Sequence, residues 1–107
     1  MSTDSLDIIN DLISGTETAQ IEFKETTGQL ERGMETLCAF LNGTGGKVVF
    51  GVTDKGRLIG QEVSDKTKRD IVEAIGRIEP LINVEVSYIP IPDTNKQVII
   101  LHVDPQL

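Results

Sequence analysis

Hydrophobic residues recur at helical spacing in three parts of the chain, residues 5–14, 29–41 and 65–78. In each part apolar side chains stand three and four positions apart, which is the pattern of a helix with one buried face. Ser64 can cap the start of the third helix, and Asn42 with the glycine after it ends the second. The pattern therefore predicts three amphipathic helices.

Other segments alternate between apolar and polar residues, or are rich in β-branched side chains, as strands are. Five segments have this character: 20–24, 47–52, 58–59, 84–88 and 97–103. A turn around Gly56 joins the second segment to the third, so we expect these two to form a hairpin. A loop with two prolines separates the last two segments, and we expect a second hairpin there.

Together these elements follow the order α-β-α-β-β-α-β-β, in which strands and helices do not alternate regularly. This order predicts an α+β fold, a mixed β-sheet with flanking helices that pack on one side of it. A chain of 107 residues has the length of one domain, so we expect a single domain over residues 1–107.

Charge limits the partners that such a domain can bind. Seventeen acidic and ten basic side chains give a net charge of −7, which disfavours non-specific attraction to nucleic acids and anionic lipids. A nucleic-acid partner must therefore bind a local basic patch, and basic residues do gather at Lys47, Lys55 and Arg57. The alternative is that these side chains form an ordinary solvated surface.

Several classes of protein are not expected. The longest apolar run, residues 98–101, is far shorter than the roughly 18 residues of a membrane span, so we expect no membrane partner. The acidic N-terminus does not resemble a secretory signal, and we expect a cytoplasmic protein. Cys38 and His102 are the only cysteine and histidine, too few for a four-ligand zinc site or an internal disulfide. Their apolar surroundings predict a core cysteine and a packed or edge histidine on a strand.

The segment Asn42–Lys47 reads Asn-Gly-Thr-Gly-Gly-Lys, which raises the question of a phosphate-binding loop. A P-loop needs a glycine, four residues, Gly-Lys and then serine or threonine, placed between a strand and a helix. Here the first glycine position holds Leu41, Val48 follows the lysine, and the loop follows a helix instead of preceding one. We therefore do not expect ATP binding of this type.

Two interpretations of this loop remain. Asn42, Gly45 and Gly46 can form a tight helix-to-strand turn, in which the glycines let the chain reverse without side-chain clashes. Alternatively, backbone N–H groups of the compact turn form an anion-binding concavity that, with Lys47, holds a phosphate of a nucleic acid.

Three stretches of the sequence together resemble the Schlafen AlbA-type domain. They are Glu17-x-x-x-x-Glu22-Phe23-Lys24-Glu25, the run LCAFLNGTGGKVVFGVTD that ends at Asp54, and Gly56 with Ile59-Gly60. The family pattern has Glu-Phe-Lys, a helix ending in Ala-Phe-Ala-Asn-Thr-x-Gly-Gly, a strand ending in Gly-Val-Asp-Asp, and a hairpin ending in Ile-Gly. Gly51 matches the glycine of the family's Gly-Val-Asp-Asp segment. The resemblance extends from about residue 6 to residue 103.

The resemblance implies a mixed sheet flanked by helices. For prokaryotic members it implies a DNA-binding module of transcriptional regulators, usually N-terminal to further domains. Larger members continue with another strand beyond the point at which this chain ends. The resemblance therefore implies that residues 1–107 are a fragment of a longer chain that lacks its C-terminal part.

Some animal members of the family are similar in this region and cut structured RNA with three acidic residues. Glu17 and Glu22 match two of them in spacing, and Asp54 lies in the segment of the third, where Thr53 replaces the first aspartate. Three converging carboxylates can bind Mg²⁺ or Mn²⁺ and activate water. The alternative is that these acids are solvent-facing charges, as most glutamates are.

Three hypotheses follow. The one we favour is a nucleic-acid-binding module, for DNA in preference to RNA, that uses no cofactor and contacts phosphates through Lys24, Lys47, Lys55 and Arg57. The second is a metal-dependent endoribonuclease that uses the acidic residues above. The third is a protein-interaction domain whose incomplete sheet edge pairs with another chain, which would form homo-oligomers, or with its own missing strand. Lys24 also has a purely structural alternative, an exposed ion pair with Glu22 on the same strand face.

Overall fold

The computed structural model describes residues 5–13, 20–78 and 83–105 of the chain. In these residues, four strands form one sheet in the order β1-β2-β4-β3. The strands are β1 (Ile21–Lys24), β2 (Gly46–Phe50), β3 (Glu85–Pro90) and β4 (Gln97–Val103). The first two strands run parallel, whereas β4 is antiparallel to both of its neighbours. The predicted mixed sheet of an α+β fold is therefore confirmed.

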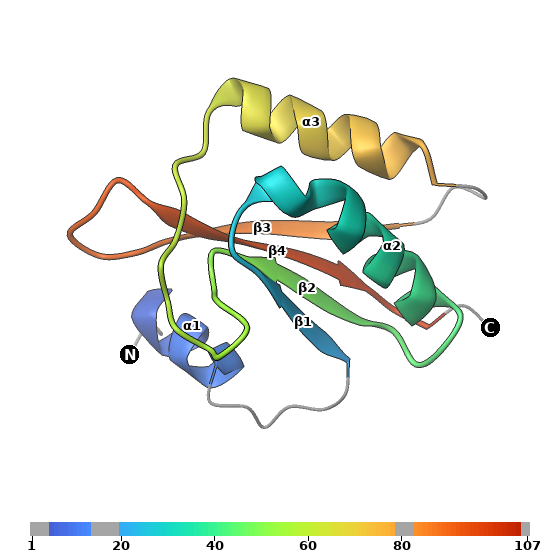
Figure 1. The fold of residues 1–107 in the computed structure, drawn as a ribbon, viewed down its shortest axis with the longest axis horizontal. Coiled ribbons are helices and arrows are strands. Elements are labelled where there is room, and N and C mark those ends of the chain that lie inside the picture. Colours follow the sequence, from blue (N-terminus) through green and yellow to red (C-terminus); the bar gives the residue numbers. More distant parts are fainter. Residues whose placement is uncertain (1–4, 14–19, 79–82, 106–107) are drawn as a thin grey trace.

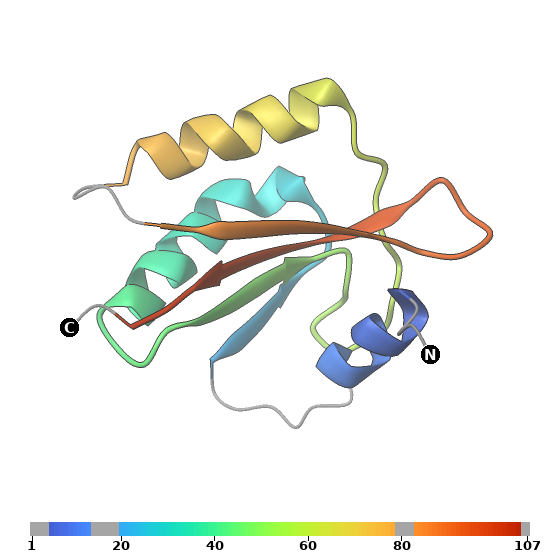
Figure 2. The ribbon, with the colours of Figure 1, turned by 180° about the vertical axis from the view of Figure 1, so that it is seen from behind.

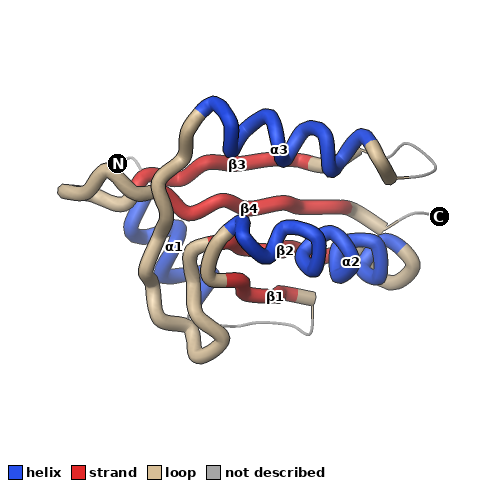
Figure 3. The backbone as a smooth tube through the Cα atoms, turned by 45° about the horizontal axis from the view of Figure 1, so that its top comes forward, coloured by secondary structure: helices blue, strands red, loops and turns tan. Residues whose placement is uncertain are grey.

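The helices lie on both faces of this sheet. They are α1 (Ser5–Ile13), the short 3₁₀ helix η1 (Thr27–Gln29), α2 (Leu30–Leu41) and α3 (Asp65–Gly76). Helices α2 and α3 pack side by side over one face, and α1 lies on the opposite face (Figures 1 and 3). The expectation that the helices share one side is wrong for α1.

The two hydrophobic clusters explain why both faces are covered. On β2, Val48 and Phe50 face α2 and α3, whereas Val49 between them points to the other face and packs in a second cluster with Ile9 of α1. A strand that is apolar on both faces needs cover on both. The consecutive apolar residues of β2 and β4 therefore require a helix on each side of the sheet.

Local signals set the starts of the two longer helices. Ser64 and Thr67 form a reciprocal capping box at the start of α3, as the sequence predicts. Helix α2 follows η1, where the hydroxyl of Thr26 accepts a hydrogen bond from the Gly28 N–H. None of the described helices has the length and hydrophobicity to cross a membrane.

The strand expected at residues 58–59 is reduced to a single bridge between Val52 and Leu58. Gly51 has a φ of 107°, which turns the chain out of β2 at Phe50, and its carbonyl accepts hydrogen bonds from the N–H groups of both Ile59 and Gly60. Because the Gly51 carbonyl accepts both hydrogen bonds, it closes a loop, and the hydrogen-bond ladder between β2 and residues 58–59 does not continue. The expected hairpin is therefore a loop that carries the chain toward α3.

Candidate nucleic-acid interface

The glycine turn, residues 42–47, joins α2 to β2. Its N–H groups are largely occupied: Asn42 donates to the carbonyl of Ala39 at 3.2 Å, and Gly43 and Gly45 donate to that of Phe40 at 3.1 and 2.9 Å. The Lys47 N–H donates to the carbonyl of Gln20 at 2.9 Å. A phosphate needs several converging N–H groups, and these four point at protein carbonyls. These four N–H groups are therefore not available to an anion, which counts against the anion-binding interpretation of this backbone.

Close packing accounts for the glycines of this turn. Gly45 has a φ of 83°, and a Cβ atom there would lie 2.6 Å from the carbonyl oxygen of Val103. A Cβ on Gly46 would lie 2.7 Å from the carbonyl oxygen of Gln20. Both positions exclude a side chain, so the interpretation as a tight helix-to-strand turn is confirmed.

A second turn, Thr53–Arg57, follows β2 and is called the basic turn below. Three hydrogen bonds hold it: Thr53 N–H to the Arg57 carbonyl at 2.9 Å, Gly56 N–H to the Thr53 carbonyl at 2.8 Å, and Arg57 N–H to the Thr53 hydroxyl at 3.0 Å. The side chains of Lys55 and Arg57 are exposed, and neither forms an ion pair within the described part of the chain. The turn thus presents two exposed cations on a fixed backbone.

Lys24 lies at the end of β1 and is less available. Its ammonium group is 3.4 Å from a carboxylate oxygen of Glu22, and its side chain is only 14% exposed, against 43% for Glu22. The predicted ion pair is therefore present, but the lysine half of it is largely buried. Lys24 is paired with Phe50 across the sheet, which places its side chain on the α2 face.

Lys47 lies apart from the other three cations. It pairs with Ile21 and His102 across the sheet, and Ile21 belongs to the cluster on the α1 face, opposite to the face of Lys24. It also stands at the start of β2, whereas the basic turn follows the end of that strand (Figures 1 and 2). The structure therefore does not bring the four predicted contacts into one patch.

The surroundings of Lys47 also carry negative charge. His102, its neighbour across the sheet, has Nδ1 3.3 Å from Glu85 Oε1 and Nε2 3.5 Å from Asp104 Oδ1. A cavity of about 370 Å³ opens beside Lys47, His102, Asp104 and the glycine turn. Two nearby carboxylates disfavour a phosphate in this cavity. This cluster was not predictable from the sequence, because it depends on the pairing of β3 with β4.

The predicted acidic triad is not assembled within the described residues. Glu17 lies outside them, Glu22 is paired with Lys24, and Asp54 is exposed in the basic turn. Across residues 5–13, 20–78 and 83–105, no three acidic, histidine or cysteine side chains gather closely enough to hold a metal ion. The nuclease site with Mg²⁺ or Mn²⁺ stays a prediction.

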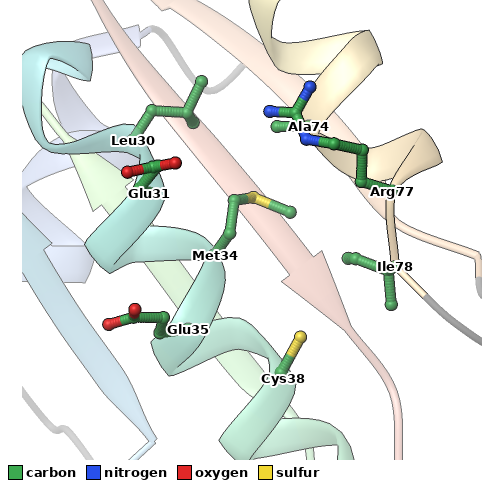
Figure 4. Close-up of a pocket in the computed structure, with 8 residues that line it drawn as sticks. All are labelled: Leu30, Glu31, Met34, Glu35, Cys38, Ala74, Arg77 and Ile78. Atoms are coloured by element: carbon green, nitrogen blue, oxygen red, sulfur yellow. The ribbon is translucent and has the colours of Figure 1, made fainter.

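A groove of about 390 Å³ between α2 and α3 is a further surface feature that the sequence did not indicate. Figure 4 shows Met34 and Cys38 of α2 pointing toward Ile78, with Arg77 at the α3 side. Cys38 is half-buried in the groove wall, so it is more exposed than a core cysteine. The groove is mostly apolar and carries no cationic pair of the kind found on the basic turn.

Comparisons with known proteins identify relatives of this fold. The family model described as Schlafen, AlbA_2 matches residues 17–107. The N-terminal domain of a Nitrosomonas europaea protein, described as related to the ATP-dependent DNA helicase RecG, has a TM-score of 0.71 at 24% identity, over 99% of this chain and 76% of that one. The DIP2311 protein from Corynebacterium diphtheriae has a TM-score of 0.59 at 18% identity. The alignment covers 92% of this chain and 21% of DIP2311. Among curated proteins, no sequence matches the chain.

Proposed function

Since the chain belongs to the Schlafen AlbA_2 family, we propose that it is a nucleic-acid-binding module, with DNA favoured over RNA. The family match confirms the resemblance read from the sequence motifs. We further propose that the module works within a longer regulatory protein, where other domains would supply the remaining activities.

The observation that carries this proposal is the basic turn. Lys55 and Arg57 are exposed and unpaired within the described residues, and hydrogen bonds through Thr53 fix the backbone that presents them. Because the turn backbone is already ordered, binding a phosphate there costs only the rotamer freedom of the side chains, and phosphate contacts position a protein on a duplex. Arginine adds the option of two parallel hydrogen bonds to one phosphate.

Lys24 lies at the same end of the sheet as the basic turn, but its side chain is on the α2 face, whereas Gly56 of the turn lies against Ile13 of α1. The carbonyl of Lys24 accepts hydrogen bonds from the N–H groups of Gly51 and Val52, so the chain leaves β2 directly beside it. Its ammonium group already pairs with Glu22, so we assign it a minor share of the binding. We assign Lys47 no part in this contact, because it lies at the other end of β2.

Salt dependence tests the proposal. The net charge of −7 leaves little attraction beyond the local contact. With two or three phosphate contacts, the logarithm of the affinity should fall with the logarithm of salt concentration at a slope of about −2 to −3. Fluorescence anisotropy of a labelled duplex, titrated with residues 1–107 at several salt concentrations, measures this slope. The same titration with double-stranded RNA of equal sequence tests the preference for DNA.

Two results would count against the proposal. An affinity that stays constant between low and high salt would reject phosphate contacts, because counterion release always accompanies them. Tighter binding of the RNA duplex would support a nucleic-acid-binding module but contradict the proposed preference for DNA.

A further inference from the structure

Strand β3 presents an open edge. It stands at the end of the sheet, and no described strand pairs with its outer side. None of its six residues is buried, whereas five of the seven residues of β4 are. Natural proteins block such edges with lysines, central prolines or inward-pointing charges. Between Glu85 and Pro90 the strand reads Val-Ser-Tyr-Ile, which contains none of these blocks.

Helix α3 runs along this edge and leaves one flank uncovered. It lies antiparallel to β3 (Figure 1), and the ammonium group of Lys68 stands 5.2 Å from the ring centre of Tyr88. Val72 follows one turn later on the same flank and is 67% exposed. At Gly76, another turn on, no heavy atom of the described residues outside the backbone of α3 lies within 4 Å of the position that a Cβ would take.

We infer that this edge binds a second copy of the chain, so that β3 pairs antiparallel with β3 of its partner about a two-fold axis. Directly opposed residues of antiparallel strands point to the same face, so the axis stands perpendicular to the sheet. The two copies of α3 then lie on the same face and run antiparallel beside each other. The two sheets join into one continuous sheet.

The spacing of strands and helices allows both contacts at once. Paired strands lie about 4.8 Å apart, and packed helices about 8–10 Å apart. Both distances are met when the axis of each α3 is displaced slightly from β3 toward β4, so that the helix lies above the space between these two strands. Ile71 and Ala74 of α3 share one cluster with Val86 of β3 and with Leu101 of β4, as this position requires.

The register of the strands agrees with that of the helices. Lys68 stands at the level of Tyr88, and the rise of about 6 Å over four helical residues corresponds to about two residues of a strand. Val72 therefore lies near the level of Val86. A two-fold axis at that level opposes Val86 to Val86 and Val72 to Val72 of the partner. The same axis places Glu85 opposite Ser87 of the other copy, and not opposite a second glutamate.

Charge complementarity favours a second copy over an arbitrary strand. With the axis at Val72, Lys68 of one copy meets the level of Gly76 in the other, at the C-terminal turn of α3. No basic residue lies in that turn, and Arg77, which follows it at the C-cap, lines the groove toward α2; the carbonyl groups of the turn carry a partial negative charge. The open space at Gly76 admits the lysine side chain. The contact occurs twice in the dimer.

Sedimentation equilibrium of residues 1–107 over a range of concentrations tests this inference. The measurement uses about 0.15 M salt, because salt screens the long-range repulsion between the two acidic chains. The expected result is a monomer–dimer equilibrium. Val72→Glu opposes two carboxylates at the axis and should raise the dissociation constant at least about a hundredfold. Lys68→Glu, which faces the partner's helix C-terminus, should raise it about tenfold. Arg32→Glu, an exposed change on α2, should leave it unchanged.

Val72 is exposed in the single chain, so Val72→Glu should fold normally, which thermal unfolding followed by circular dichroism verifies. A strict monomer at every concentration overturns the inference. So does a dimer that both Val72→Glu and Lys68→Glu leave intact, because it would use another surface.

Discussion

The two turns that bracket β2 look alike in sequence but differ in what they leave available. Each contains glycine and lysine, yet the glycine turn directs its N–H groups to protein carbonyls and packs against Val103. The basic turn satisfies its backbone through Thr53 and leaves Lys55 and Arg57 exposed. Glycines next to a lysine thus indicate a phosphate site only where the backbone N–H groups have no protein acceptor or where the cationic side chain is exposed.

The largest effect is expected at the glycine turn. Gly45→Ala forces a side chain into positive φ and within 2.6 Å of the Val103 carbonyl, so we expect a loss of about 3 kcal/mol in the free energy of unfolding. Urea denaturation measures it. Gly43→Ala is the matched control, because its nearest atoms lie 3.8 Å from the added Cβ, and it should cost less than about 0.5 kcal/mol. Equal losses in both variants would show that the turn is not closely packed.

A smaller effect is expected at the basic turn. Gly56 has a φ of 84°, and a Cβ there would lie 3.3 Å from Cγ2 of Ile13 in α1, a contact that a side chain can relieve. Gly56→Ala should therefore cost about 1.5 kcal/mol, mostly from the backbone conformation. The same denaturation experiment measures it. A loss larger than that of Gly45→Ala would reverse the comparison between the two turns.

Much of the fold follows from sequence patterns, and the exceptions have physical causes. The alternation at Ile21 and Phe23 and the cap at Ser64 each predicted an element that the structure contains. The strand at residues 58–59 failed because the carbonyl of Gly51 binds two N–H groups, which depends on a backbone conformation that composition does not specify. The side on which α1 packs was also not predictable from its own stripe, which shows only that one face is buried.

The candidate site was predictable only as a set of residue types. Lys24 and Lys47 fall on opposite faces because Ile21, not Glu22, is aligned with Lys47, and this register is set by the packing of β1 beside β2. A shift of one residue would have placed both lysines on one face. By contrast, the occupied N–H groups of Asn42 and Gly43 follow a general rule of helix C-termini, where hydrogen bonds of the 3₁₀ type tighten the last turn.

The central claim is that the basic turn, and not the glycine turn, contacts nucleic acid. The most direct measurement compares the affinities of Lys55→Glu and Lys47→Glu for the same labelled DNA duplex at low salt, with circular dichroism to verify folding. We predict a loss of about five- to tenfold for Lys55→Glu, and less than about twofold for Lys47→Glu, because only the former removes a phosphate contact. A larger loss for Lys47→Glu, or equal losses in the two variants, would contradict the account.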